Sequence, residues 1–253
     1  MKKYKALLWD IDNTLLSFEA SETAALQKGF RDFGFGEITA AQLDRYKKIN
    51  RRYWEALERG EVSREEVLVG RYREFFAEEH LDVSTAAAFN AEYQENLGNT
   101  IVFEDYAWEL TAGLKGKILQ FAASNGTKTA QDRKLANAGL DRIFDGIFIS
   151  EDLGTEKPMP EFYSRMFDRL EKRGIVLSRE DVLMIGDSLT SDMRGAQNAG
   201  IDGCWFHPSD GAESLPDVHP LYEIRSLREV PAIIGIDPDP VPGLSTESRR
   251  EQK

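Results

Sequence analysis

Two carboxylates, Asp10 and Asp12, stand two positions apart directly after an apolar run, and Asn13 and Thr14 follow them at once. The run before them, residues 6–9, is typical of a strand that is buried on both faces, as in a parallel sheet. Burying charge beside such a strand costs free energy unless another group pairs with it. These acids therefore mark either an ordinary surface turn or a site that carries out chemistry.

Polar residues follow later apolar runs as well. The runs that we predict to be strands are residues 4–9, 118–123, 147–150, 182–186 and 203–206. Ser124 and Asn125 directly follow the second run. Asp187 follows the fourth with Asp192 beyond it, and Lys157 lies in the turn-rich stretch before it. Helical segments between the runs indicate a parallel sheet. Ligands bind outside the carboxyl ends of such strands, so we expect these side chains to converge on one crevice.

This group of residues suits phosphoryl transfer. Several aspartates in one crevice repel one another, and their oxygens suit a hard cation such as Mg²⁺. Asp10 could attack phosphorus to form an aspartyl-phosphate. Asp12 could protonate the leaving oxygen and then take a proton from water. Asp187 would complete the metal site, and Asp192 would also belong to it, either supporting the ligands from behind or acting through a water. Lys157 would balance an anionic substrate.

Ser124 and the backbone amides near Asn125 can hold phosphate oxygens. Each residue also has an ordinary explanation, which the sequence leaves open. The SNG stretch at 124–126 is typical of a plain turn. Lys157 could be a solvated loop residue, and Asp192 could simply favour the dipole at the start of a helix.

Four motifs resemble those of the haloacid dehalogenase superfamily, in that superfamily's order. They are DIDNT at 10–14, SNG at 124–126, KP at 157–158 and GDSLTSD at 186–192. The resemblance implies a Rossmann-like core, a helical cap inserted after the first motif, and Mg²⁺-dependent phosphoryl transfer. It implies that Asp10 is the nucleophile, while Asp12 is the acid/base and binds the metal through its backbone. Asp187 would be the remaining protein ligand of the metal, and Ser124 and Lys157 would bind the phosphate.

The chain reads as an α/β core with an all-helical insertion. The inserted segment lacks proline and is rich in helix formers at helical spacing, so we expect four helices there. Ser63 and Glu66 form a capping-box pattern at the start of the third. The predicted parts are a Rossmann-like core at 1–16 and 113–236, a helical cap at 17–98, a hinge or linker at 99–112 and a flexible tail at 237–253.

The cap resembles a narrower group within the superfamily. The stretches IN at 49–50, YW at 53–54, LERGEVSREE at 57–66 and GRY at 70–72 look like the cap of the YjjG/YfnB group. That group includes nucleoside 5′-monophosphate phosphatases. The resemblance makes Asn50, Trp54 and Arg71 candidates for contact with the leaving group of the substrate. Trp54 could equally be a residue that packs helices together, as could Tyr46 and Tyr53.

Composition limits the partners. The net charge of −12 and the pI near 4.9 argue against binding of a nucleic acid polymer, which needs a basic face. The one cysteine, Cys204, cannot form an internal disulfide, which favours a reducing compartment. No stretch has the apolar length of a membrane span. We expect a cytoplasmic monomer or homodimer that acts on a small phosphorylated metabolite.

The sequence therefore predicts a Mg²⁺-dependent phosphomonoesterase, with a nucleoside 5′-monophosphate as the expected substrate. A sugar-phosphate phosphatase or a phosphomutase of the same fold is the alternative. A receiver-type signalling module is an unfavoured alternative, because it needs only about 120 residues and no cap, whereas this chain is longer and has a predicted cap. A dehalogenase would have no use for the acid/base or the metal site.

Overall fold

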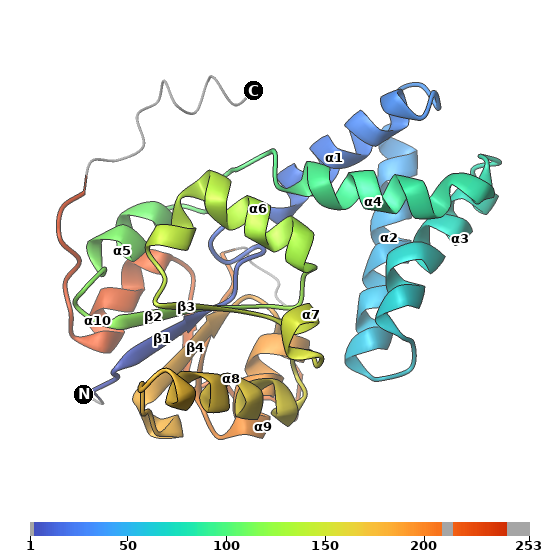
Figure 1. The fold of residues 1–253 in the computed structure, drawn as a ribbon. Coiled ribbons are helices and arrows are strands. Elements are labelled where there is room, and N and C mark those ends of the chain that lie inside the picture. Colours follow the sequence, from blue (N-terminus) through green and yellow to red (C-terminus); the bar gives the residue numbers. More distant parts are fainter. Residues whose placement is uncertain (1–2, 209–214, 242–253) are drawn as a thin grey trace. The chain divides into compact units, whose positions relative to one another are not determined.

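The computed structural model describes residues 3–208 and 215–241 (Figure 1). The chain divides into two compact units, one formed by residues 1–18 and 101–253 and the other by residues 19–100. Most of the tail predicted at 237–253 lies outside the described residues. None of the helices in the described part combines the length and the apolar character that crossing a membrane requires.

The first unit contains the parallel sheet that the sequence predicts. In its described part the sheet has six strands in the order β3-β2-β1-β4-β5-β6, and every neighbouring pair is parallel. The strands are β1 (Ala6–Trp9), β2 (Leu119–Ser124), β3 (Gly146–Ile149), β4 (Val182–Gly186), β5 (Asp202–Phe206) and β6 (Tyr222–Ile224).

The register of the central strands places their carboxyl ends side by side. Trp9 at the end of β1 is level with Ala122 of β2 and with Ile185 of β4. The Asp10 amide still donates to the Ile185 carbonyl, at 2.9 Å. The residues that follow β1, β2 and β4 therefore emerge at the same edge of the sheet, where the strand order changes direction.

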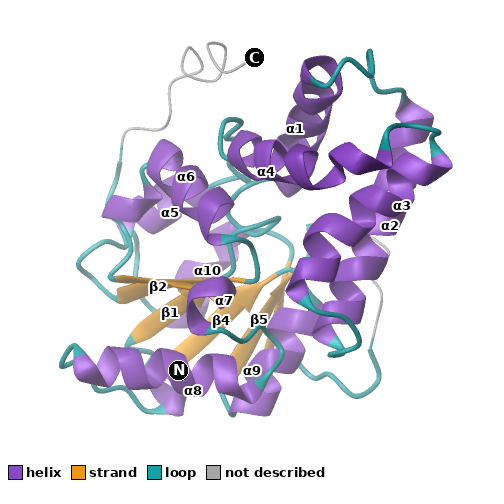
Figure 2. Ribbon diagram, turned by 45° about the vertical axis from the view of Figure 1, so that its right-hand side comes forward, coloured by secondary structure: helices purple, strands orange, loops and turns teal. Residues whose placement is uncertain are grey.

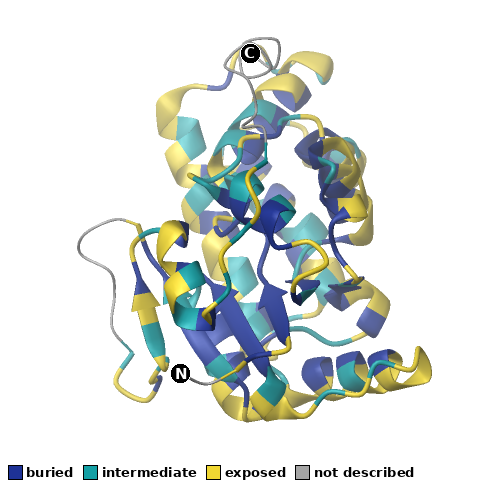
Figure 3. Ribbon diagram, turned by 90° about the vertical axis from the view of Figure 1, so that its left-hand side faces the viewer, coloured by how far each residue is buried: buried dark blue, intermediate teal, exposed yellow. Residues whose placement is uncertain are grey.

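Helices cover both faces of the sheet, as Figure 1 shows. One face packs against α5 (Ala107–Gly113), α6 (Lys128–Ala138) and α10 (Val230–Ile234), and the other packs against α8 (Pro160–Lys172) and α9 (Arg194–Ala199). A short helix, α7 (Ser150–Leu153), follows β3. All four residues of β1 are buried, and the central strands are dark blue in Figure 3. The apolar run at 6–9 thus has the two-sided burial that its composition predicts.

Residues 19–100 are helical (Figure 2). The helices are α1 (Phe18–Asp32), α2 (Ala40–Glu58), α3 (Arg71–Glu78) and α4 (Ala86–Leu97), and a π-helical turn, Glu66–Gly70, leads into α3. The predicted capping box is present, because the Ser63 amide donates to the Glu66 carboxylate and the Glu66 amide donates to the Ser63 hydroxyl. Buried aromatic rings fill this unit. Tyr46 stacks on Tyr72, and their hydroxyls lie 2.8 Å apart, so Tyr46 packs helices together.

The chain leaves the first unit and re-enters it through two segments that pair with each other. Leu16 forms an antiparallel bridge with Phe103, and the Ser17 amide donates to the Val102 carbonyl at 2.8 Å. After this pairing, the last part of the stretch predicted as a linker, residues 107–112, lies in α5, which packs on the sheet. The described start of the predicted tail contacts the end of that helix, because the Asp239 amide donates to the Gly113 carbonyl.

Candidate active site

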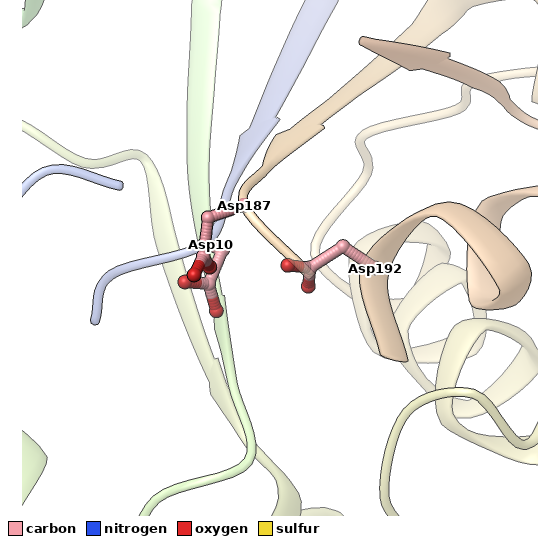
Figure 4. Close-up of side chains that lie close together, drawn as sticks. All are labelled: Asp10, Asp187 and Asp192. Carbon is pink, nitrogen blue, oxygen red and sulfur yellow. The ribbon is translucent and has the colours of Figure 1, made fainter. Parts of the chain in front are cut away.

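Three aspartates gather at the carboxyl edge of the sheet (Figure 4). Asp10 follows β1, Asp187 follows β4, and Asp192 lies in the π-helical turn Leu189–Met193. One carboxylate oxygen from each lies within 4.8 Å of the other two. Asp10 and Asp192 are buried and Asp187 is half-buried. The structure therefore brings together three residues that the sequence picks out on separate strands.

Lys157 lies between two of these acids. Its ammonium group donates to Oδ1 of Asp10 at 2.7 Å, to Oδ1 of Asp192 at 2.6 Å and to the Ala123 carbonyl at 2.8 Å. These bonds use all three ammonium protons. The residue is 1% exposed, which excludes a solvated loop lysine. Asn125 fixes its backbone, since the Asn125 side chain donates to the Lys157 carbonyl and accepts from the Lys157 amide, both at 2.8 Å.

The cluster is short of positive charge. Burial raises the pKa of Asp10 to about 7; Lys157 opposes this, while Asp192 and Asp12 add to it. Burial, with repulsion from Asp10 and Asp192, also raises the pKa of Asp187 well above its usual range. Burial disfavours the charged form of Lys157, but the two neighbouring acids outweigh this and its pKa lies above the ordinary value. One lysine thus leaves the acids under-compensated, which is the setting in which an oxygen-liganded cation binds.

Asp192 has both of its carboxylate oxygens engaged. Oδ1 accepts from Lys157, and Oδ2 accepts from the Ser188 amide at 3.1 Å. Its exposure of 1% rules out a solvated residue that only favours a helix dipole. Gly186 makes room for it, because a Cβ atom added there would lie 2.3 Å from Oδ2 of Asp192.

Ser124 ends β2 beside the cluster and is buried. Its hydroxyl oxygen accepts from the Gly126 amide at 3.0 Å, so the SNG stretch is a tight turn as well as a candidate site. Thr14 also contacts the cluster, since its hydroxyl donates to Oδ1 of Asp187 at 3.5 Å. Asn13 has a positive φ of 62°, a conformation that asparagine tolerates, and its side chain accepts from the Phe18 amide.

The carboxylate of Asp12 contacts α6 and is not one of the three acids of this cluster. The Gln131 side-chain amide donates to its Oδ2 at 2.6 Å, and Lys134 forms an ion pair with its Oδ1. The sequence did not single out Gln131 or Lys134. The sequence did contain a pattern that could have identified them, because these two polar residues lie one turn apart on the helical segment expected directly after the SNG motif.

The three candidates in the helical unit lie together. The Asn50 side-chain oxygen accepts from Arg71 at 2.6 Å and from the Trp54 indole at 3.1 Å, and its amide donates to Glu22 at 3.0 Å. Arg71 also donates to Asn90. Asn50 and Arg71 are buried inside the unit, whereas Trp54 is half-buried. Asn50 and Arg71 therefore orient the indole of Trp54.

Comparison with known proteins agrees with the geometry. The profile of the haloacid dehalogenase-like hydrolases matches residues 4–200. The chain belongs to this family. The HAD-hydrolase YfnB of Bacillus subtilis strain 168 is 36% identical over 94% of this chain and 98% of its own length. The crystal structure of YfnB bound to magnesium matches with a TM-score of 0.84 at 35% identity, covering 93% of this chain and 100% of that one.

Two further relatives of the present chain are named as pyrimidine 5′-nucleotidases. PynA of Streptococcus pneumoniae R6 is 35% identical over 90% of this chain and 93% of its own length. YjjG of Escherichia coli K12 is 26% identical over 92% of this chain and 98% of its own. The family, the parallel Rossmann-like sheet and the prediction of a hydrolase with phosphatase and nucleotidase relatives are thus confirmed.

Proposed function

We propose that the protein is a Mg²⁺-dependent phosphomonoesterase that forms an aspartyl-phosphate on Asp10 and acts on pyrimidine nucleoside 5′-monophosphates. The observation that carries the mechanism is the buried contact between Lys157 and Asp10 beside two further carboxylates. A nucleophilic carboxylate held by a lysine, next to a cluster that suits a cation, is what an anionic phosphate ester needs. A dehalogenase would have no use for the additional acids.

The donor set fits Mg²⁺. The available ligands are all oxygens, and burial together with like charge raises the pKa of Asp10 and Asp187. A divalent cation removes that repulsion. Asp10 and Asp187 would hold it, with the backbone of Asp12 as a further ligand, and Asp192 would act through a water because its oxygens already accept from Lys157 and Ser188. When bound, the ion neutralises charge on the transferring phosphoryl group.

In the first half of the reaction, an Asp10 oxygen attacks phosphorus. The bond from phosphorus to the ester oxygen breaks, and its electron pair leaves with that oxygen. Asp12 gives the leaving oxygen a proton. Lys157 and Ser124 offset the charge on the phosphoryl oxygens, which is an electrostatic contribution that persists through the transition state.

In the second half, a water oxygen attacks the phosphorus of the aspartyl-phosphate. The bond between phosphorus and the Asp10 oxygen breaks, and its electron pair returns to the carboxylate. Asp12 takes the proton that the water loses. Inorganic phosphate leaves, and the proton that Asp12 gained is ready for the next leaving group.

The nucleotide preference rests on the helical unit, which we propose is a cap that contacts the leaving group. Trp54 offers a partly exposed indole, and Asn50 and Arg71 hold its orientation. An indole stacks on a nucleobase, whereas a sugar phosphate offers no flat ring. The pyrimidine 5′-nucleotidase activity named for two relatives points the same way.

Phosphate release from a panel of phosphate esters, with Mg²⁺ and with excess EDTA, tests the chemistry. We expect turnover in Mg²⁺ alone. Asp10→Asn should abolish it with the fold intact, since an amide cannot form the acyl-phosphate. Lys157→Ala should lower both affinity and rate. Full turnover in EDTA, or a near wild-type kcat for Asp10→Asn, would refute the mechanism.

Trp54→Ala tests the cap. We expect it to lower kcat/KM for a pyrimidine nucleotide by roughly tenfold, the range of one base stack, and to affect p-nitrophenyl phosphate little. Arg51→Ala, an exposed residue on the same helix, is the matched control. Equal losses on both substrates would indicate a damaged unit rather than a recognition contact. A wild-type preference for sugar phosphates would end the nucleotidase proposal and leave the phosphatase one standing.

A further inference from the structure

Two residues of α6 grip the Asp12 carboxylate by its two oxygens. Gln131 donates to Oδ2 at 2.6 Å, and the Lys134 ammonium pairs with Oδ1. They lie one helical turn apart, so both side chains leave the same face of the helix. Gln131 and Lys134 are each 1% exposed, whereas the side chain of Asp12 is 24% exposed. The Asp12 carboxylate is thus held by two buried side chains, while the Asp12 side chain itself remains partly exposed.

Lys134 is an unusual lysine. A helix that covers a sheet ordinarily points its lysines to water, and a lysine is rarely this deeply buried unless it is paired. Here the ammonium group lies against the Asp12 carboxylate and 4.9 Å from the centre of the Phe18 ring. Lys128, on the first turn of the same helix, shows the usual arrangement, since it is exposed and pairs with Asp132.

The backbone turn before α6 leaves room for the contact between Gln131 and Asp12. A Cβ atom at Gly126 would lie 2.4 Å from the Gln131 side-chain nitrogen, so a glycine is needed there for Gln131 to reach Asp12. Thr127 caps the helix by accepting from the Ala130 amide, which fixes where α6 begins. The turn after β2 therefore serves Asp12 as well as the phosphate side of the site.

We propose that Lys134 and Gln131 are positioning residues that hold the Asp12 carboxylate against the water that breaks the aspartyl-phosphate. This rests on the proposed function. In that step the water oxygen bonds to phosphorus, the phosphorus–Asp10 bond breaks with its electron pair returning to Asp10, and the water proton moves to Asp12. Asp12 accepts this proton, and its contacts with Lys134 and Gln131 fix its orientation before the water attacks.

Rapid-mixing kinetics with p-nitrophenyl phosphate separate this role from a structural one. The nitrophenolate ion leaves without a proton, so the first turnover does not need Asp12 as an acid, while every later turnover needs it as a base. For Lys134→Met we expect a first-turnover rate constant within about twofold of the wild type. Later turnovers should slow by about 10- to 100-fold, the range for a misplaced catalytic group. Methionine keeps the length of the side chain and its contact with Phe18.

Lys128→Met is the matched control and should leave both phases unchanged. A Lys134→Met enzyme with the wild-type steady-state rate, or with both phases slowed equally, would overturn the positioning role. The proposed function is judged separately by wild-type turnover and by its loss in Asp10→Asn.

A second experiment removes the Asp12 carboxylate, which is the group that Lys134 contacts. If Lys134 acts through Asp12, then Lys134→Met should change the steady-state rate of an Asp12→Asn enzyme by less than about twofold, because the effects of coupled residues do not multiply. This double variant also contains no unpaired buried lysine, which protects it from the folding defect that Asp12→Asn alone could cause. Effects that multiply would overturn the proposal.

Discussion

A single methyl group at Gly186 should disable the acidic cluster. Gly186 is the last residue of β4, and a Cβ atom there would lie 2.3 Å from Oδ2, 2.4 Å from Cγ and 2.7 Å from Cβ of Asp192. Ordinary van der Waals contact begins at 3.4 Å. All three atoms belong to one side chain, so Gly186→Ala must push Asp192 away from its position.

The cost follows from what holds Asp192. The side chain is 1% exposed, and it accepts from Lys157 and from the Ser188 amide. Each hydrogen bond to a charged group contributes about 1.5–3 kcal/mol, and inserting a methyl group into a packed interior costs about 1–3 kcal/mol. If the displaced side chain loses one of its two hydrogen bonds, Gly186→Ala should lower the free energy of unfolding by roughly 2.5–6 kcal/mol.

Urea unfolding measures this loss, and Mg²⁺ titration of turnover shows whether the cluster has been distorted. Gly203→Ala is the matched control, because Gly203 lies in the neighbouring strand β5 and a Cβ there would meet the flexible Met193 sulfur at 3.0 Å. We expect that variant to lose no more than about 1.5 kcal/mol.

A Gly186→Ala protein with wild-type stability and turnover would refute this reasoning. A combination with Asp192→Gly identifies the clash, because glycine removes the Cβ atom of residue 192 as well as its carboxylate. The methyl group then has room, so adding Gly186→Ala to Asp192→Gly should cost less than about 0.5 kcal/mol, and the same full cost in both backgrounds would mean that the methyl group collides elsewhere.

Three further predictions concern pH, the metal site and the helical unit. Without divalent cations, the free energy of unfolding should fall as the pH rises from about 4 to about 7, because burial raises the pKa of Asp10 from 3.8 to about 7 and the folded protein keeps a proton that the unfolded chain has released. Urea unfolding in EDTA measures this slope, and a flat profile would contradict it. Trp205→Phe should weaken Mg²⁺ activation several-fold, because the Trp205 indole donates to the Asp187 carbonyl at 2.8 Å; an unchanged Mg²⁺ titration would count against it. Gly29→Ala should lower stability by about 1–3 kcal/mol, because its Cβ would lie 2.7 Å from the Phe89 ring, and thermal unfolding checks this.

The sequence predicted the strands well where both of their faces are covered. Residues 182–186 were expected to form a strand and do so, because an apolar run is the only pattern that suits burial on two sides. The edge strand β6, Tyr222–Ile224, escaped prediction. It is three residues long and partly exposed, so it has no apolar run to reveal it.

The sequence predicted which residues form the site better than it predicted the contacts that these residues make. The rule that ligands bind at the carboxyl ends of parallel strands places Asp10 and Asp187 at the same edge of the sheet, and the observed strand order makes them neighbours. The direction of the Asp12 side chain was not readable, because spacing along the chain does not say which helix lies opposite a residue. Arg71 shows the same limit: an arginine in an amphipathic helix suggests a surface contact, and its burial among Asn50 and Asn90 depends on how the helices pack.

The pairing of Leu16 with Phe103, and of Ser17 with Val102, has a consequence for how this protein can change over time. The two ends of the helical insertion are already joined by backbone hydrogen bonds that belong to the other unit. The inserted segment therefore behaves as a loop whose two ends are held together by the first unit, whatever residues the loop contains. The entropic cost of closing such a loop grows slowly with its length. Evolution can lengthen, exchange or rebuild everything between these anchor points without disturbing the strand that precedes Asp10.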